Sequence, residues 1–280
     1  MPYTSLAMPE LPEVETIKNE LSPLVVGQRF TQVTICDPKL VCGTSVEELG
    51  QGLVGQTIQS IERRGKYLIF NLSGGRSVIM HLRMTGTLLL NARVTSRYAR
   101  AVFRLSNRTD LVFNDQRRLG LVWLVKDAST VIARLGPEPL AESFTPDVLA
   151  GLLEKHRIPI KATLLDQSII AGIGNMYADE ALFAARIHPL KKADALSPEE
   201  VATLCHHIGS VLRSAISGRG ASVGTYVRPE GQLGSAQFHF KVAHRYGEPC
   251  PACGTAIKRI SVRNRGTYFC SNCQRLTSRR

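Results

Sequence analysis

The stretch CPACGTAIKRISVRNRGTYFCSNC, from Cys250 to Cys273, holds four cysteines in two Cys-x2-Cys pairs that are sixteen residues apart. Two tight pairs at this spacing bring four thiolates around one tetrahedral Zn²⁺. Two disulfides are the alternative, but the odd total of seven cysteines and the lack of an export signal disfavour them. We therefore predict a C-terminal zinc finger with one structural Zn²⁺, whose ligands are Cys250, Cys253, Cys270 and Cys273.

The residues between the two pairs predict a short β-hairpin. Residues 257–262 and 267–269 are β-rich, and residues 264–266 lie at or near the tip between them. Because a metal would hold so small a hairpin rigid, Arg265 would be presented as a fixed donor to a phosphate.

The charge of the chain is unevenly distributed. Residues 1–60 carry seven acidic and three basic residues, whereas residues 241–280 carry nine basic residues and one acidic residue, within a formal net charge of +12. A basic C-terminal part favours a polyanionic partner, most simply nucleic acid. A solvated basic tail is the alternative.

Composition indicates a globular protein. The 280 residues are 44% hydrophobic, which is enough for the packed cores of two modest domains or one large one. No apolar run approaches the length that crosses a bilayer, and the opening residues lack the basic flank and apolar core of a signal peptide. We expect a cytoplasmic protein that does not bind a membrane.

The hydrophobic pattern changes along the chain. From about residue 25 to 135, short β-rich runs such as YLIFNL and SVIMHL alternate with turn signals, which favours an antiparallel sandwich or barrel. LGPEPLAESFTPD contains three prolines and predicts a linker. After Thr145 the pattern is helical, with Ser197 and Glu200 in N-cap and N3 positions of the last helix. Residues 218–234 are glycine-rich and predict a mobile loop.

Four loops carry candidate binding residues. In AGIGNMY, the glycines permit a tight turn, and Asn175 would direct its amide toward an anion; the alternative is a helix corner without a ligand. Lys66 stands where a turn meets an apolar strand; the alternative is a solvated turn lysine. Apolar side chains next to arginines in loops can wedge into a base stack while holding phosphates. Such residues are Met84, Arg117, Arg118 and Leu119.

Taken together, these motifs resemble the formamidopyrimidine-DNA glycosylase family. The similar segments run in order from Met8 to about Gln274: MPELPEVET, RRGKYL, HLRMTGTL, DQRRLG, LGPEPL, GIGNMYADEALFAARIHP and the four-cysteine tail. The resemblance implies an α+β fold, with an N-terminal β-sandwich, a helix-two-turn-helix domain and a C-terminal zinc finger. It also implies a monomeric base-excision repair enzyme that removes oxidised purines (8-oxoguanine and formamidopyrimidines) from damaged double-stranded DNA, with apurinic/apyrimidinic lyase activity by β,δ-elimination.

The resemblance assigns the opening motif a catalytic role. The family uses the secondary amine of an N-terminal proline as its nucleophile, a role that here falls to Pro9, with Glu10 as general acid and base. A proline inside a chain has no nucleophilic amine, so we expect translation from Met8 or processing to Pro9. Pro12 suits the first turn of a helix whose positive end would keep the nearby amine unprotonated.

The remaining roles also follow from the resemblance. Lys66 matches a phosphate-binding lysine that assists β-elimination, and Arg265 matches the finger arginine that assists δ-elimination. Met84 and Arg117, with Leu119 as third wedge, match residues that fill the gap left by the extruded base. Further DNA contacts are Asn175, Arg118 and Arg157.

The chain departs from the family pattern at several places. Leu119 replaces the usual phenylalanine, Tyr98-Ala99-Arg100 replaces a His-x-His motif, and Ala243-His244-Arg245 replaces Tyr-Gly-Arg. An endonuclease VIII-like enzyme for oxidised pyrimidines is one alternative, although that type normally opens Pro-Glu-Gly-Pro-Glu and this chain has Leu11 in place of the glycine. A catalytically silent DNA-binding protein of the same fold is the other.

The sequence predicts the following division. It comprises a non-native or processed extension at 1–8, a catalytic β-sandwich domain with an N-terminal helix at 9–135, a linker at 136–145, a helix-two-turn-helix domain at 146–234 that includes a flexible lesion loop at 218–234, and a zinc-finger module at 235–280.

Overall fold

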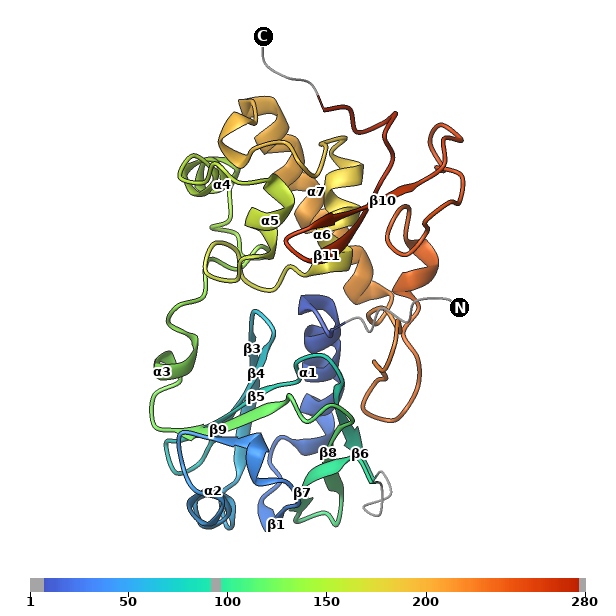
Figure 1. Cartoon of the computed structure of the whole chain (residues 1–280). Helices are drawn as coiled ribbons and strands as arrows, with labels where there is room; N and C mark the ends of the chain where they lie inside the picture. The colour runs from blue at the N-terminus through green and yellow to red at the C-terminus, as the bar shows by residue number, and fades with distance from the viewer. Residues whose placement is uncertain (1–7, 92–96, 277–280) are drawn as a thin grey trace. The chain divides into compact units, whose positions relative to one another are not determined.

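The computed structural model describes residues 8–91 and 97–276 and divides into two compact units (Figure 1). Unit 1 holds the described residues up to Ala133 together with Gly218–Gln237, and unit 2 holds Arg134–Ser217 together with the described residues from Phe238 onward. The predicted extension at 1–8 lies outside the described residues, apart from Met8. Within the described ranges, no helix combines the length and apolar character that a bilayer crossing requires.

Unit 1 is built around two β-sheets. One has the strand order β1-β7-β8-β6 and the other β2-β9-β5-β4-β3, and every neighbouring pair is antiparallel except the short parallel pair β2 and β9. The strands are β1 (Phe30–Ile35), β2 (Val41–Cys42), β3 (Ile58–Arg64), β4 (Tyr67–Leu72), β5 (Ser77–His81), β6 (Gly86–Leu90), β7 (Ala99–Leu105), β8 (Asp110–Asp115) and β9 (Leu121–Val125).

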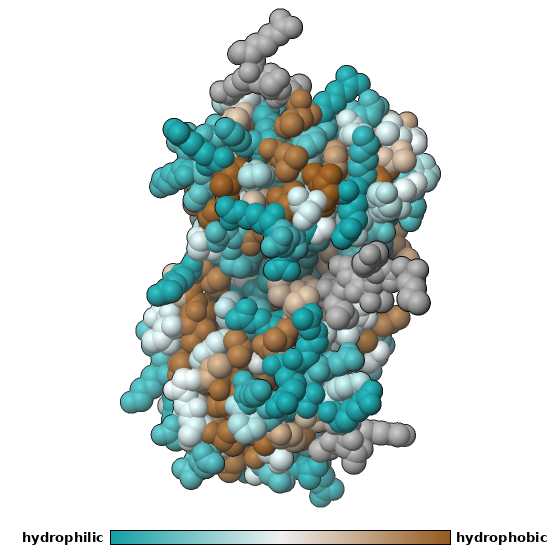
Figure 2. All heavy atoms as spheres, in the orientation of Figure 1, coloured by the Kyte–Doolittle hydropathy of each residue, from teal (hydrophilic) through white to brown (hydrophobic). Residues whose placement is uncertain are grey.

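One hydrophobic core joins the two sheets and the first helix, α1 (Leu11–Val25). Phe103 and Phe113 enter this core from the first sheet, Phe70 and Met80 from the second, and Ile17 from α1. Along β1, apolar residues alternate with exposed polar ones, and Figure 2 shows hydrophilic side chains over much of the visible surface. The shorter elements of unit 1 are η1 (Pro38–Leu40), α2 (Val46–Leu53) and α3 (Ser129–Ile132).

The glycine-rich segment 218–234 belongs to unit 1, whereas the sequence placed it with the helical domain. Tyr226 is 2% exposed and packs in the core of unit 1. The backbone N–H of Leu90 donates to the carbonyl of Pro229 at 2.8 Å. The segment contains no strand, as expected, and these contacts fasten it to the β-sheets.

Unit 2 consists of helices and a small hairpin. Its elements are α4 (Pro146–Leu153), α5 (Ile160–Leu165), α6 (Asn175–Ala184), η2 (Ala193–Ala195), α7 (Pro198–Ser217), β10 (Lys258–Val262) and β11 (Arg265–Phe269); η3 (Ala236–His239) lies where the two units meet along the chain. The predicted capping box of α7 is present, because Ser197 N donates to Glu200 Oε2 at 2.8 Å and Glu200 N donates to Ser197 Oγ at 3.3 Å. Helix α6 packs against α5, α7 and β11.

Candidate active site and nucleic-acid interface

The start of α1 places Pro9 and Glu10 in a buried position. Glu10 is the N-cap residue and is 2% exposed. Its backbone N–H donates to Glu13 Oε2 at 2.8 Å, which satisfies one of the donors that a helix N-terminus leaves without a partner. Pro12 occupies the first turn, where its missing N–H removes no helical hydrogen bond. The local sequence therefore fixes the backbone around the proposed nucleophile.

Glu13 also binds the glycine-rich segment. Its second carboxylate oxygen, Oε1, accepts a hydrogen bond from Ala221 N at 2.7 Å. Gly220 has a φ of +76°, and a Cβ there would lie 3.1 Å from Glu13 and 2.9 Å from the Tyr226 ring. Only glycine combines that conformation with so close an approach. One buried carboxylate thus links the Glu10 backbone to residues 220 and 221.

A second acidic residue of α1 holds the same segment. Glu20 Oε1 accepts from Arg219 Nη1 at 3.0 Å and from Arg228 Nε at 2.7 Å. The two arginines flank the buried Tyr226, so the segment is held on both sides of that side chain.

Lys66 lies in the tight turn between β3 and β4. Arg64 pairs with Tyr67, and Gly65 has a φ of +56°, which a glycine-first two-residue hairpin turn requires. Lys66 is only 4% exposed, so it is not the solvated turn lysine that the sequence left open. Burial, together with the positive charges of Arg83 and Lys66, lowers the pKa of nearby His81 to about 3. His81 is therefore neutral and accepts from Arg83 N at 3.0 Å.

The predicted wedge residues come together in unit 1. Met84 lies in the turn before β6, and Arg117 and Leu119 lie in the loop after β8, the strand that pairs with β6. Arg117 Nη1 lies 3.2 Å from Met84 Sδ, and Leu119 is 40% exposed.

Arg118 has a protein partner that the sequence did not reveal. Its guanidinium binds Asp37 through Nε at 2.5 Å and Nη2 at 2.8 Å, and Asp37 is 4% exposed. This hydrogen bond is the largest influence on the carboxyl and holds the pKa of Asp37 below its usual range. Arg100, which replaces a histidine of the family motif, donates to the Asp115 carbonyl at 2.7 Å and lies 4.0 Å from Asp37.

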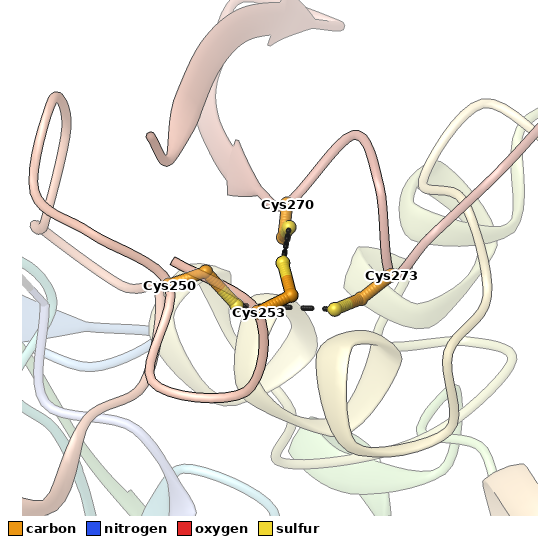
Figure 3. Close-up of side chains that lie close together, drawn as sticks. All are labelled: Cys250, Cys253, Cys270 and Cys273. Atoms are coloured by element: carbon orange, nitrogen blue, oxygen red, sulfur yellow. Dashed lines mark hydrogen bonds between the residues drawn. The ribbon is translucent and has the colours of Figure 1, made fainter. Parts of the chain in front are cut away.

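In unit 2, the four predicted zinc ligands converge (Figure 3). All four Sγ atoms lie within 4.8 Å of one another, with Cys250 3.9 Å from Cys273 and Cys253 3.5 Å from Cys270. A tetrahedral Zn²⁺ with Zn–S bonds of about 2.3 Å separates its sulfurs by about 3.8 Å. The four thiolates therefore fit one Zn²⁺, which would fix the two knuckles at the base of the β10-β11 hairpin.

The hairpin presents Arg265 at the start of β11, where it pairs with Val262, directly after the turn and so near the tip as expected. The turn consists of Arg263 and Asn264, whose φ values of +45° and +60° give the twist that two-residue hairpins prefer. Arg265 itself is exposed.

The next residue, Gly266, anchors the hairpin to the helices. Its carbonyl accepts from Asn175 Nδ2 at 2.9 Å and from Lys161 Nζ at 3.1 Å. Lys161 also pairs with Asp179 at 2.6 Å; the two side chains are 0% and 1% exposed, and Tyr268 N donates to Asp179 Oδ2 at 3.0 Å. Burial raises the pKa of Asp179 to about 7, against the opposing effect of Lys161. Asn175 thus lies at the predicted helix start and donates to Gly266, the residue that follows Arg265.

Arg157 stands apart from this group. It is 89% exposed and its Nε lies 3.7 Å from Asp194 Oδ2. Among the described contacts of the chain, no hydrogen bond or ion pair joins it to Asn175 or Arg265.

Sequence reasoning missed the acidic residues that organise the site: Glu13, Glu20, Asp37, Asp115 and Asp179. Only Glu13 had a detectable signal, as the third helical residue after a capping position.

Family models match most of the chain. The formamidopyrimidine-DNA glycosylase N-terminal domain matches residues 8–122, the formamidopyrimidine-DNA glycosylase H2TH domain matches residues 135–226, and the zinc finger found in FPG and IleRS matches residues 247–276. The chain belongs to the formamidopyrimidine-DNA glycosylase family. This membership confirms the resemblance and the predicted order of β-rich domain, helix-two-turn-helix domain and four-cysteine zinc finger.

Individual relatives agree with the family models. The formamidopyrimidine-DNA glycosylase of Chloroflexus aurantiacus is 45% identical over 271 residues, which cover 95% of this chain and 98% of the relative. The crystal structure of the MutM (FPG) protein from Thermus thermophilus matches with a TM-score of 0.88 and 40% identity, over 95% of this chain and 98% of that one. The Lactococcus lactis glycosylase non-covalently bound to DNA containing an abasic site matches with a TM-score of 0.87 and 36% identity, over 95% and 100% of the two chains.

Proposed function

We propose that this chain removes oxidised purines from duplex DNA as a bifunctional glycosylase and apurinic/apyrimidinic lyase, with Pro9 as nucleophile. The observation that carries the proposal is the full-length family match, which begins at residue 8 and ends in the four-cysteine finger. Two of the similar Lactococcus lactis structures hold DNA with a Fapy-dG lesion or an abasic site, which are a substrate and an intermediate of such an enzyme. We place its action in the cytoplasm, on DNA.

In the proposed reaction, the Pro9 nitrogen attacks C1′ of the damaged nucleotide and the bond from C1′ to the base breaks. The C1′–O4′ bond then breaks, O4′ takes a proton, and the ring-opened sugar is left as an iminium. This iminium has no N–H proton to lose, so it stays cationic and withdraws electrons during the two later eliminations. Glu10, buried next to Pro9, moves protons during sugar opening and base loss. The positive end of α1 disfavours protonation of the amine, so more of it is nucleophilic at neutral pH.

The amine exists only if the working chain begins at Pro9. We therefore propose translation from Met8, followed by loss of that methionine. The matched part of this chain, 95%, spans the whole of the Herpetosiphon aurantiacus relative, which supports a start close to residue 8.

Lys66 is proposed to bind phosphate and assist β-elimination, and Arg265 to bind phosphate and assist δ-elimination. Asn175, Arg118 and, more peripherally, Arg157 would contact the DNA backbone, because amide and guanidinium groups donate to phosphate oxygens. Met84, Arg117 and Leu119 would fill the gap that base extrusion leaves. Leu119 is apolar but cannot stack as an aromatic ring does, so the opposite base is read less strictly than by a phenylalanine wedge.

Two measurements test the proposal: excision of the damaged base and trapping of the covalent protein–DNA complex. Protein that begins at Pro9 is incubated with duplexes that contain 8-oxoguanine or thymine glycol, with and without borohydride. We expect faster release of 8-oxoguanine and a borohydride-dependent covalent complex. Preference for thymine glycol would favour an endonuclease VIII-like enzyme, and binding without any trapped complex would favour a silent DNA-binding protein.

A matched pair of variants tests the role of Lys66. Lys66→Met should slow strand cleavage at a preformed abasic site, whereas Lys126→Met should not, because Lys126 is exposed just beyond the end of β9. Equal rates for the two variants would remove Lys66 from the proposed mechanism.

A further inference from the structure

Asp115 is a buried carboxylate at the end of β8, between the two loops that carry the wedge residues. It is 1% exposed, and it pairs in register with Gly86, the first residue of β6. The turn that contains Met84 therefore precedes one strand end, and the loop that contains Arg117 and Leu119 follows the neighbouring strand end. Figure 1 shows β6 and β8 side by side.

Both carboxylate oxygens of Asp115 accept hydrogen bonds from the loops. Oδ2 accepts from Leu119 N at 2.7 Å and from Gly120 N at 2.7 Å. Oδ1 accepts from Arg117 N at 3.0 Å and from the hydroxyl of Thr85 in a very short contact. Thr85 is itself 3% exposed and accepts from Arg117 N at 3.0 Å. One carboxylate and one hydroxyl thus tie the backbone of one wedge loop to the side chain of the other.

The backbone of both loops contains tightly packed glycines and residues with positive φ. A Cβ on Gly86 would lie 2.3 Å from the Leu82 carbonyl oxygen, and a Cβ on Gly120 would lie 2.5 Å from the Phe113 ring. Arg83 and Arg118 have φ values of +55° and +58°, a conformation that costs energy in a residue other than glycine. Such a conformation persists when the surrounding contacts hold it, and Asp115 supplies several of those contacts.

We propose that Asp115, acting with Thr85, is a positioning residue that preorganises Met84, Arg117 and Leu119 to fill the gap in the base stack. The proposal rests on the proposed function. Without this pair, both loops would have to be ordered when the base is extruded, and that entropy cost would be added to the barrier for extrusion. The three side chains make the contact with DNA; Asp115 acts only through them.

The four groups that hydrogen-bond to Asp115 require a carboxylate at this position. Every group that faces Asp115 Oδ1 or Oδ2 is a donor, so the site needs two acceptor oxygens. An asparagine amide has one oxygen and one NH₂ group. Whichever way the amide turns, its NH₂ group would face backbone N–H donors of the loop after β8: Arg117 N in one orientation, Leu119 N and Gly120 N in the other. Asp115→Asn should therefore release part of that loop while nearly preserving the shape of the side chain.

The experiment places 2-aminopurine opposite 8-oxoguanine in a duplex and follows its unstacking by stopped-flow fluorescence, alongside single-turnover excision. We expect Asp115→Asn to slow both by about 10- to 100-fold, the range that loss of one or two hydrogen bonds gives. Thr85→Val, which removes only the hydroxyl, should slow both in the same direction, and Thr85→Ser should retain the wild-type rates. Asp127→Asn is the matched control, because Asp127 caps an exposed turn by accepting from Ser129 N.

A double-mutant comparison separates positioning from general damage to the fold. In a Met84→Ala/Arg117→Ala/Leu119→Ala background, Asp115→Asn should cost less than twofold, because all three side chains that it positions are gone. Full additivity, or wild-type unstacking rates in both Asp115→Asn and Thr85→Val, would overturn the proposal. If the wild-type protein neither unstacks the probe nor excises 8-oxoguanine, the proposed function has failed, an outcome distinct from the failure of the positioning role.

Discussion

The buried pair of Lys161 and Asp179 gives the sharpest stability prediction. Nζ and Oδ1 are 2.6 Å apart, and the two side chains are 0% and 1% exposed. At an effective dielectric constant of about 20, two unit charges at that distance attract by about 6 kcal/mol, of which desolvation cancels a large part. Lys161→Met removes this attraction and the hydrogen bond to the Gly266 carbonyl, and leaves Asp179 in a buried site without its cation.

We expect Lys161→Met to lower the unfolding free energy of unit 2 by about 3–5 kcal/mol, the usual cost of breaking a buried pair. The loss should lie near the lower end of that range. Burial already raises the pKa of Asp179 to about 7, so the carboxyl is readily neutralised when Lys161 is absent. Lys161→Met/Asp179→Asn should recover part of the loss, because asparagine keeps an acceptor for Tyr268 N.

The assay uses one probe for each unit. Trp123 in β9, the single tryptophan of the chain, reports the urea unfolding of unit 1, and zinc release to a chromogenic chelator reports the finger of unit 2. Lys191→Met is the matched control, because Lys191 pairs with Glu200 at 2.5 Å near the surface of the same unit and should cost less than about 1 kcal/mol. The reasoning is refuted if the two lysine variants cost the same, or if Lys161→Met shifts the Trp123 transition and leaves zinc release unchanged.

Three further predictions concern other parts of the chain. Burial lowers the folded-state pKa of His81 to about 3, so the stability that neutral His81 contributes is fully present above its unfolded pKa. That stability is lost as pH falls toward 3, at about 1.4 kcal/mol per pH unit. His81→Gln should therefore flatten the loss of stability that Trp123 fluorescence measures between about pH 6.5 and 4, and an unchanged slope would argue against a buried neutral imidazole. Glu20→Gln should speed amide hydrogen exchange across residues 219–228, because Arg219 and Arg228 lose a shared anion; unchanged exchange there would show that Tyr226 alone holds the segment. Zinc removal by a chelator should abolish duplex binding while the Trp123 transition stays in place, and retained affinity would contradict the finger's proposed role.

Features set by short-range patterns could be predicted from the sequence. The cysteine spacing gave the metal site, Ser197 and Glu200 gave the start of α7, and the glycines before Asn175 gave the turn that precedes α6. Each depends on residues within a few positions of one another, or on a pairing that the residue types enforce.

Features set by contacts between residues far apart in the sequence could not be predicted. Asp37 and Arg118 are 81 positions apart, and Glu13 and Ala221 are 208 positions apart, so no local pattern pairs them. The glycine-rich segment belongs to unit 1 because Tyr226 packs in the hydrophobic core of that unit.

Mapping the covalent bond between protein and DNA decides whether the amine of Pro9 is the nucleophile. Protein that begins at Pro9 is trapped with borohydride on an 8-oxoguanine duplex and digested, and the peptides are sequenced by mass spectrometry. We predict that the reduced sugar adduct lies on the nitrogen of Pro9 and is absent from protein that retains Met1 to Met8. An adduct on Lys66, or equal trapping by the longer chain, would contradict it.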